Sequence, residues 1–390
     1  MTRLGCTNFL KSVVIPQNGY PAICFVRRGH SGGDAGYECG RRRPMTIRYV
    51  HLFLILAVVG TWACGGAESV VESNEEGGVV APSVPRKRQP FVGAWALKRI
   101  ERRNAEGELL EPPTEDRVGY LIYDETGYMG VTLMRPNRTP HARVVDGRGQ
   151  PTAEEALQDY SAYTSYFGRF TVNEEEKIVI HHLEGSLNPG GVGSDYKRFY
   201  DFTDGDLVLK PPMRDDGSQS LLTWERLSDL DEVDLSETHR KLFGVFRVES
   251  VTRYTTDGYE VEAEQYDTAY LLYARSGHMS VHLMRPDRRP FNADQPTADE
   301  ALHAKQSYGS YFGPFSVHEI AGCISCPGPR DEGYLLHHRV GSEDPSANGV
   351  DARRYYELTD THLTLRPPVR TDEQGRQVIS VIRWTRLGPS

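Results

Sequence analysis

The chain contains two copies of one sequence pattern, and this internal repeat constrains the fold more than any other feature. Matching segments recur in the same order at offsets of roughly 145 to 160 residues. They are residues 133–138 with 283–288, 151–157 with 296–302, 166–168 with 311–313, 181–186 with 337–342, 209–212 with 365–368 and 224–227 with 384–387. Copies of this length are too long for a solenoid repeat and suit whole domains. We therefore predict two domains, residues 91–227 and 243–388, joined by an acidic linker at 228–242.

Within each copy the local pattern is mainly β. An apolar segment at 118–123 and an alternating segment at 128–134 flank a turn, which predicts an antiparallel hairpin. The 38 glycines and 24 prolines fit a chain rich in turns. The second copy keeps one face of the second strand apolar and changes the other face. The kept residues are Met129, Val131 and Leu133, matched by Met279, Val281 and Leu283. On the other face, Tyr128 and Thr132 become His278 and His282, and Met134 is matched by Met284. In a barrel, we expect the first face to be packed and the second to face solvent or a lumen.

One helix is expected in each copy. Thr152 with Glu155, and Thr297 with Glu300, have the spacing of a capping box. Apolar residues follow at helical spacing as far as Phe167, and Gly168 lies where such a helix would end. Each copy therefore reads as an antiparallel barrel that closes its own edges and carries one inserted helix.

The motifs of the repeat also resemble a known family. Gly93-x-Trp95 in the first strand and Trp224-x-Arg226 in the last are similar to the lipocalin signature, and the whole repeat resembles bacterial lipocalin-like domains. This resemblance implies two tandem antiparallel barrels that bind small molecules, with Trp95 packed on Arg226 at the closed end. The second copy departs from the signature, because Phe246 stands where the first copy has Trp95.

Candidate ligand-binding residues lie on the predicted strands and at the barrel rim. Adjacent residues on a strand point to opposite faces, so one histidine of each His-His pair can face the lumen, or both can be structural. A rim arginine can clamp a carboxylate or phosphate, or can form an ordinary salt bridge. The candidates are Tyr123, Arg135, Tyr166 and His181 in the first copy and Tyr273, His278, His282, Arg285, Tyr311 and His337 in the second. His278 and His282 share one strand face, which either binds an acidic ligand or is solvated.

Few other residues of the chain form a motif with a known chemical role. Cys323 and Cys326 are spaced as a Cys-x-x-Cys, which we interpret as a local disulfide, because no βαβ pattern suggests a redox motif and no second pair suggests zinc. No close set of metal ligands, phosphate loop or nucleophile elbow occurs, so we expect no metal and no cofactor.

The N-terminal region predicts export. Arg48, an apolar run at 52–59 and Ala63-Cys64 have the order of a secretory signal, and Cys64 resembles the lipidated cysteine of bacterial lipoproteins. We expect a signal peptide at 45–63, a flexible tether at 64–90 and an upstream extension at 1–44 that is disordered or not translated. The alternative is that the apolar run is a buried strand or helix. The expected location is the cell envelope, as an outer-membrane lipoprotein or a periplasmic protein, with secretion as the alternative.

These features favour a protein that binds or carries a small, partly apolar molecule. The net charge of −9 argues against a nucleic acid partner, and a lipid anchor is the one expected contact with a membrane. One alternative is an isomerase- or cyclase-type enzyme that uses a lumen histidine as acid or base. Another is a non-catalytic interaction module whose barrels are filled with bulky side chains.

Overall fold

The computed structural model describes residues 85–145, 148–320, 326–328 and 330–388. All of them belong to one compact unit, Gly78–Ser390. The upstream extension, the signal peptide, Cys64 and most of the tether lie outside the described residues and stay predictions. Within the described part of the chain, no helix is both long and apolar enough to cross a membrane.

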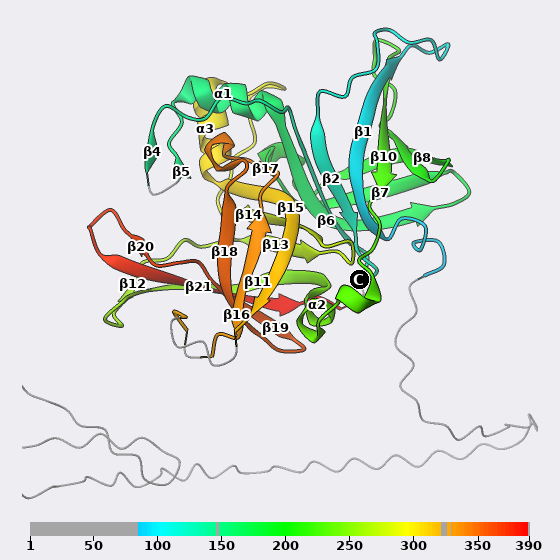
Figure 1. Ribbon diagram of the computed structural model, residues 1–390. Helices are drawn as coiled ribbons and strands as arrows, with labels where there is room; N and C mark the ends of the chain where they lie inside the picture. The colour runs from blue at the N-terminus through cyan, green and yellow to red at the C-terminus, as the bar shows by residue number, and fades with distance from the viewer. Residues whose placement is uncertain (1–84, 146–147, 321–325, 329, 389–390) are drawn as a thin grey trace, which may run out of the picture. The chain divides into compact units, whose positions relative to one another are not determined.

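The first domain is a closed antiparallel barrel of eight strands (Figure 1). Around the barrel the strands follow the order β1-β10-β9-β8-β7-β6-β3-β2, and β1 pairs with β2 to close it. Their bounds are β1 Gly93–Arg103, β2 Val118–Tyr123, β3 Tyr128–Met134, β6 Tyr163–Asn173, β7 Ile178–Ser186, β8 Asp195–Thr203, β9 Asp206–Lys210 and β10 Gln219–Arg226. A small hairpin of β4 (Val144–Val145) and β5 (Arg148–Gly149) lies between β3 and the first helix.

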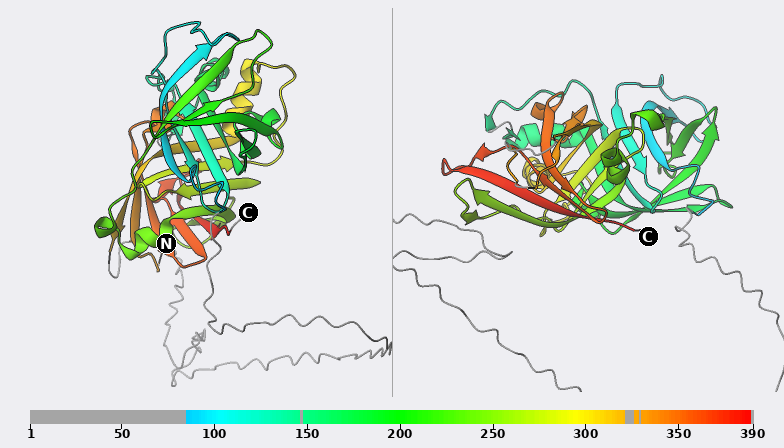
Figure 2. Two further views of the ribbon diagram at one scale, coloured as in Figure 1. Left: turned by 90° about the vertical axis from the view of Figure 1, so that its right-hand side faces the viewer. Right: turned by 60° about the horizontal axis from the view of Figure 1, so that its bottom comes forward.

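The second domain repeats this barrel, so the expected fold class is confirmed. The order is β11-β13-β14-β15-β16-β18-β19-β21, and pairing of β11 with β21 closes the ring (Figure 2). The bounds are β11 Gly244–Thr255, β13 Thr268–Tyr273, β14 His278–Met284, β15 Tyr308–Glu319, β16 Gly333–His338, β18 Asp351–Leu358, β19 His362–Arg366 and β21 Gln377–Arg386. Three short strands extend it, β12 Glu260–Val261, β17 Gly341–Ser342 and β20 Arg370–Thr371.

Each barrel carries the expected helix, but the helix is shorter than expected. Both capping boxes are present at the starts of α1 (Ala153–Ala162) and α3 (Ala298–Gln306), which pack against each other (Figure 1). Residues four apart share a face in a helix and also in a strand, so apolar spacing did not reveal that Phe167 belongs to β6. Gly168 does not end a helix. It is required because a Cβ there would lie 2.0 Å from the His182 carbonyl oxygen, at a bulge between β6 and β7.

The acidic linker contains a short helix. Residues 237–242 form α2 (Glu237–Leu242), which begins with a capping box at Ser236. The side chain of Leu242 is fully buried in the core of the second barrel. Short 3₁₀ turns occur at Pro189–Gly191, Glu232–Asp234 and Pro345–Ala347.

The apolar strand face that both copies keep points into the barrel lumens. Met129 and Val131 belong to the core of the first barrel, and Met279 and Val281 belong to the core of the second. Large aromatic side chains fill the same cores, among them Trp95, Phe170 and Trp224 in the first barrel and Phe246, Tyr273, Tyr356 and Trp384 in the second. The kept residues are therefore the packed face that the sequence predicts.

The closed ends carry the lipocalin-type contact. Arg226 pairs with Trp95 across β10 and β1, and its guanidinium carbon lies 5.7 Å from the indole centre. A Cβ on Gly93 would come within 3.2 Å of that guanidinium, which explains the glycine of the motif. In the second barrel Arg386 lies 4.5 Å from the ring centre of Phe246. The contact thus persists although the tryptophan is lost.

The strand face that varies between the copies forms the interface between the two domains. It faces neither solvent nor a lumen, which corrects the expectation from sequence. The outer faces of both barrels meet in a third apolar core, made of Ala94, Ile122, Met134, Tyr163, Phe167 and Leu187 from the first domain and Val245, Tyr270, Leu272, Ala274, Met284, Tyr308 and Phe312 from the second. A closed barrel fills its lumen with one strand face, and the second domain covers part of the other face.

The two ends of this interface differ in chemistry. At one end His141 Nε2 lies 2.6 Å from an Asp159 carboxylate oxygen, and Lys305 Nζ lies 3.0 Å from the same oxygen. All three side chains are buried. At the other end the equivalent residues are Tyr160 and Phe291, whose rings pack edge to face at 5.4 Å. The repeat is therefore symmetric in its backbone and asymmetric in its buried polar groups.

Candidate ligand-binding site

One histidine of the first His-His pair lies inside the first barrel between two tyrosines. His181 on β7 has an exposed fraction of 1%. Its Nε2 lies 2.6 Å from the hydroxyl of Tyr123 on β2, and its Nδ1 lies 3.0 Å from the hydroxyl of Tyr166 on β6. The neighbour, His182, points outward and contacts Asp195. The alternation of strand side chains thus separates the pair as expected.

The second barrel repeats this arrangement with equivalent residues. His337 on β16 places its Nε2 2.8 Å from the Tyr273 hydroxyl and its Nδ1 2.8 Å from the Tyr311 hydroxyl. Six of the ten candidate residues therefore form two matched Tyr-His-Tyr clusters. We call them the lumen triads: Tyr123, His181 and Tyr166 in the first barrel and Tyr273, His337 and Tyr311 in the second.

Both lumen histidines are held neutral. Burial lowers the pKa of His181 well below its ordinary value, and the nearby charge of Arg198 adds to the effect. Burial and the nearby charge of Arg354 lower the pKa of His337 in the same way. A neutral imidazole has one N–H donor and one acceptor nitrogen.

The hydrogen bonds of the first triad have one arrangement in which the hydroxyl hydrogen of Tyr123, the more deeply buried of the two tyrosines, has an acceptor. Among the described residues, Nε2 of His181 is the one hydrogen-bond partner of the buried Tyr123 hydroxyl, so that hydroxyl donates to Nε2. The N–H at Nδ1 then donates to the oxygen of Tyr166. Arg198 also donates to that oxygen. In this arrangement the hydroxyl hydrogen of Tyr166 has no acceptor in the described part of the chain and can donate to a ligand.

An arginine at the matching position contacts the triad of the second barrel. Neither arginine is among the candidates from the sequence. Arg354 Nη2 donates to the Tyr311 hydroxyl at 3.4 Å. Arg198 and Arg354 occupy matching positions on β8 and β18, where they pair with Val179 and Leu335, two residues before the lumen histidine of each barrel. Comparison of residues 195–200 with 351–356 would have revealed them, because both segments read Asp-x-basic-Arg-aromatic-Tyr.

Below each triad the lumen is filled. Phe91, Trp95 and Phe170 close the first barrel beneath Tyr123 and are at most 1% exposed. Towards the opposite end of the barrel the apolar side chains are only partly buried, and they include Leu97, Leu133, Tyr196 and Leu222. A small molecule would therefore contact the triad from this less buried end, which we call the barrel mouth.

The remaining histidine candidates lie outside the lumens. His282 is fully buried between the domains, where its Nδ1 lies 3.0 Å from the hydroxyl of Ser165 and its ring packs on Phe167. His278 packs edge to face against Tyr120 of the first domain. Neither residue faces a lumen, because β14 directs this face to the domain interface. The expectation of an acidic-ligand pocket on this face is wrong.

The two rim arginines lie at the mouths. Arg135 directly follows β3, is exposed and lies near Arg117, whose pKa is lowered by partial burial and by the charge of Arg135. Arg285 directly follows β14, and its Nη2 lies 3.2 Å from a Glu264 oxygen.

One cysteine of the predicted pair lies among the described residues. Cys326 is disulfide-bonded. Cys323 lies outside the described residues, so the expected pairing stays a prediction. Among the described residues, no group of three or more histidines, cysteines and carboxylates is arranged to hold a metal ion.

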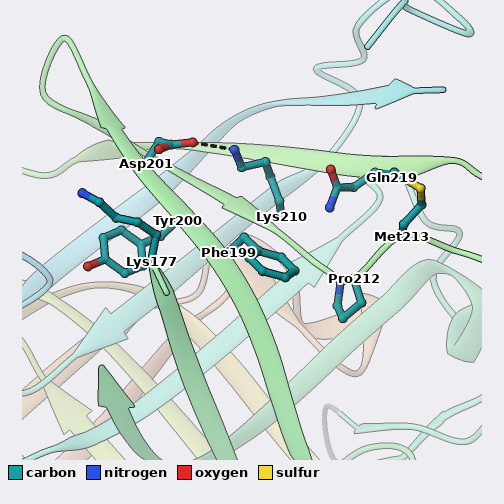
Figure 3. Close-up of a pocket in the computed structure, with 8 residues that line it drawn as sticks. All are labelled: Lys177, Phe199, Tyr200, Asp201, Lys210, Pro212, Met213 and Gln219. Atoms are coloured by element: carbon teal, nitrogen blue, oxygen red, sulfur yellow. Dashed lines mark hydrogen bonds and ion pairs between the residues drawn. The ribbon is translucent and has the colours of Figure 1, made fainter. Parts of the chain in front are cut away.

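A surface hollow on the outside of the first barrel contains none of the candidate residues (Figure 3). It has a volume of about 540 Å³ and is lined by Lys177, Phe199, Tyr200, Asp201, Lys210, Pro212, Met213 and Gln219. Lys210 and Asp201 form an ion pair across it. The hollow is open to solvent, Lys210 and Asp201 pair with each other and Lys177 lies over the Tyr200 ring, so the lumen triads are the stronger candidate site.

Comparison with known proteins gives one informative match. The lipocalin-like domain family matches residues 92–227 and 243–387, the segments that fold into the two barrels. No curated protein matches the sequence. A solved protein of unknown function from Nostoc punctiforme is 9% identical, with 77% of this chain and 97% of that chain covered and a TM-score of 0.20. A variant of transferrin binding protein B from Haemophilus parasuis is 9% identical over 76% of each chain, with a TM-score of 0.17.

Proposed function

This chain belongs to the lipocalin-like domain family through both of its barrels, and on that premise we propose that each barrel binds a small, partly apolar molecule at its mouth. The observation that carries the proposal is the lumen triad, which is repeated in both barrels. In each triad, when the inner tyrosine donates to the imidazole, the hydroxyl hydrogen of the outer tyrosine, Tyr166 or Tyr311, has no acceptor among the described residues. A ligand with a hydrogen-bond acceptor, such as a carbonyl or carboxylate oxygen, would satisfy this donor.

The surroundings of the triad support a ligand with an apolar body. Leu97, Leu133 and Leu222 are partly buried above the first triad and would lose solvent contact under a bound molecule. Burial of apolar surface contributes about 25 cal/mol per Å². The acceptor would then orient the ligand, and the apolar body would supply most of the affinity.

The geometry is less suited to an acid–base enzyme. Each lumen histidine already has a tyrosine on both nitrogens, and no carboxylate hydrogen-bonds to either imidazole in the described residues. The interaction-module alternative requires barrels filled with bulky side chains, and large aromatic side chains do fill part of each lumen. The presence or absence of a retained small molecule therefore separates the two functions.

Native mass spectrometry of the protein purified from its own host tests the proposal. We expect a retained small molecule in the wild type and a reduced amount in the double variant Tyr166→Phe/Tyr311→Phe, which removes both free donors. The matched control is Tyr128→Phe, because Tyr128 lies between the domains against Tyr270. Wild-type protein that carries no small molecule, and binds none from a host extract, would favour the interaction module.

We also propose that the protein is exported and anchored through a lipid on Cys64. The order basic residue, apolar run, alanine and cysteine in residues 48–64 supports this part of the proposal. Cells labelled with a fatty-acid analogue should incorporate the label into wild-type protein and not into Cys64→Ser. Equal labelling of the two proteins would contradict the anchor and would leave the binding function untouched.

A further inference from the structure

Arginine side chains gather at the mouth of the second barrel from five separate segments. Arg253 is on β11, Arg354 on β18 and Arg370 on β20. Arg285 follows β14 and comes from the same domain. Arg148 comes from the β4–β5 hairpin of the first domain, so this mouth is completed by residues of both domains.

A single carboxylate ties several of these arginines together. Arg148 Nη1 lies 3.0 Å and Arg285 Nη2 lies 3.2 Å from the same oxygen of Glu264. The Tyr266 hydroxyl donates to the other oxygen at 2.8 Å. Although burial opposes it, the charges of these arginines and the bond from Tyr266 lower the pKa of Glu264 to about 2. Glu264 is therefore ionised and fixes Arg148 and Arg285 at the rim.

Deeper in the mouth, positive charge exceeds the negative charge around it. Burial and repulsion from Arg148, Arg354 and Arg253 lower the pKa of Arg370 to about 10, and Glu264 is the acid that opposes them. Arg253 Nε is buried and has no hydrogen-bond partner among the described residues. A buried N–H without a partner is costly unless an acceptor fills the position.

The first barrel differs at the position equivalent to Arg253. Arg102 pairs with Ser220 on β10, as Arg253 pairs with Ser380 on β21. Arg102 Nη2, however, donates to Asp216 at 2.9 Å. The first barrel therefore supplies its own acid to this arginine.

We infer that the mouth of the second barrel binds an organic anion, a carboxylate or sulfonate on an apolar body, between Arg370, Arg354 and Arg148. The inference rests on the proposed function and specifies its ligand class for one barrel. The anionic group occupies the space among the guanidinium groups and accepts from the free hydroxyl of Tyr311, which lies 3.4 Å from Arg354. Planar guanidinium groups match the paired oxygens of such an anion.

Two fluorescent probes with closely related ring systems separate charge recognition from apolar binding. Anilinonaphthalene sulfonate carries a sulfonate, and phenylnaphthylamine is neutral. We expect Arg148→Gln and Arg370→Gln in the full chain each to weaken one anilinonaphthalene sulfonate site by about tenfold, which is about 1.4 kcal/mol. Phenylnaphthylamine should bind these variants within about twofold of wild type.

The matched control is Arg383→Gln, which removes the same charge from an outward-facing arginine that pairs with Glu249. It should bind both probes as the wild type does. Arg148 lies on an exposed hairpin, so its variant separates loss of the site from loss of folding.

Each outcome is decisive. Undiminished sulfonate binding by Arg148→Gln and Arg370→Gln, or an equal loss of both probes, overturns the anion site and leaves the proposed function standing. If neither probe binds the wild-type chain, the proposed function itself fails.

Discussion

Arg138 of the first domain and Arg288 of the second are equivalent residues, and each donates hydrogen bonds to backbone carbonyls of the opposite domain. Arg138 Nη1 donates to the Glu343 carbonyl at 3.0 Å, and Arg138 also donates to the Ser342 carbonyl. Arg288 Nη2 donates to the Leu187 carbonyl at 2.7 Å, and Arg288 also donates to the Ser186 carbonyl. The contact is reciprocal, as in the interface of a symmetric dimer.

This relationship explains why two motifs recur together in the sequence. The Leu-Met-Arg-Pro-x-Arg motif supplies the arginine, and the His-His-x-x-Gly-Ser motif of the other copy supplies the carbonyls. Each copy therefore carries both halves of one interdomain contact. Their recurrence reflects the association of the domains as well as the fold of each barrel.

Loss of one of these arginines should destabilise the protein. Arg288→Ala leaves the Ser186 and Leu187 carbonyls without their donor at the interface, so we expect a loss of about 2 to 4 kcal/mol. Urea unfolding followed by circular dichroism measures the loss. Arg289→Ala, at the exposed neighbouring residue, is the control and should stay within about 0.5 kcal/mol of wild type. Equal stability of the two variants would mean that the contact contributes nothing.

The variable strand face should be sensitive to the addition of a single methyl group. A Cβ on Gly130 would lie 2.6 Å from Nε2 of His282 in the other domain. Gly130→Ala should therefore cost about 1 to 3 kcal/mol by overpacking the interface. Gly309→Ala is the matched control, because the nearest atom to its Cβ would be 3.8 Å away.

A double variant tests whether the two domains share this contact. His282→Ala removes the ring that the new methyl group meets, so Gly130→Ala should cost less in that background than alone. Additive losses in the thermodynamic cycle would show that Gly130 and His282 do not contact each other in solution.

The local fold was predictable because its signals are short in range. Strands 118–123 and 128–134 have the bounds that the alternation of side chains indicated. The start of α1 was also predictable, because a capping box is a contact between Thr152 and Glu155, residues three positions apart. Its end was not, since Phe167 fits both a helical and a strand spacing.

The site was predictable only in part because its members come from distant segments. Alternation predicts that His181 or His182 faces the lumen, but not which of them. The arginines at the second mouth come from five elements and two domains, and no single motif contains them. The domain interface could not be predicted from alternation. Alternation assigns the face of His282 to the lumen or to the outside of its own barrel, and it does not reveal that a second barrel covers the outside.

The closed-end contact gives a further prediction. Trp95 is 1% exposed, lies under Arg226 and donates from Nε1 to the Phe91 carbonyl at 2.8 Å. Trp95→Ala should cost about 3 to 5 kcal/mol, the range for truncation of a buried aromatic side chain. Trp95→Phe copies the residue of the second barrel and should cost much less. A loss below about 1 kcal/mol for Trp95→Ala would show that this end is not packed in solution.

Acid should destabilise the protein through its buried histidines. Burial lowers the pKa of His282 to about 3, against about 6.5 in an unfolded chain. Between these values the unfolded state binds a proton that the folded state does not. The free energy of unfolding therefore has its full value above about pH 6.5 and falls as the pH drops towards about 3. His181 and His337, whose pKa values are also lowered by burial, act in the same direction.

The contribution of His282 can be isolated by substitution. One proton changes the free energy of unfolding by about 1.4 kcal/mol per pH unit. His282→Asn should therefore flatten the dependence by about that amount between roughly pH 4 and pH 6, where His282 is protonated only when unfolded. Ser165→Ala is the control, because it removes the hydrogen bond at 3.0 Å and keeps the titrating ring. It should lower stability at every pH without changing the slope. If His282→Asn keeps the wild-type slope, His282 is accessible to protons in the folded protein and the domain interface is open there.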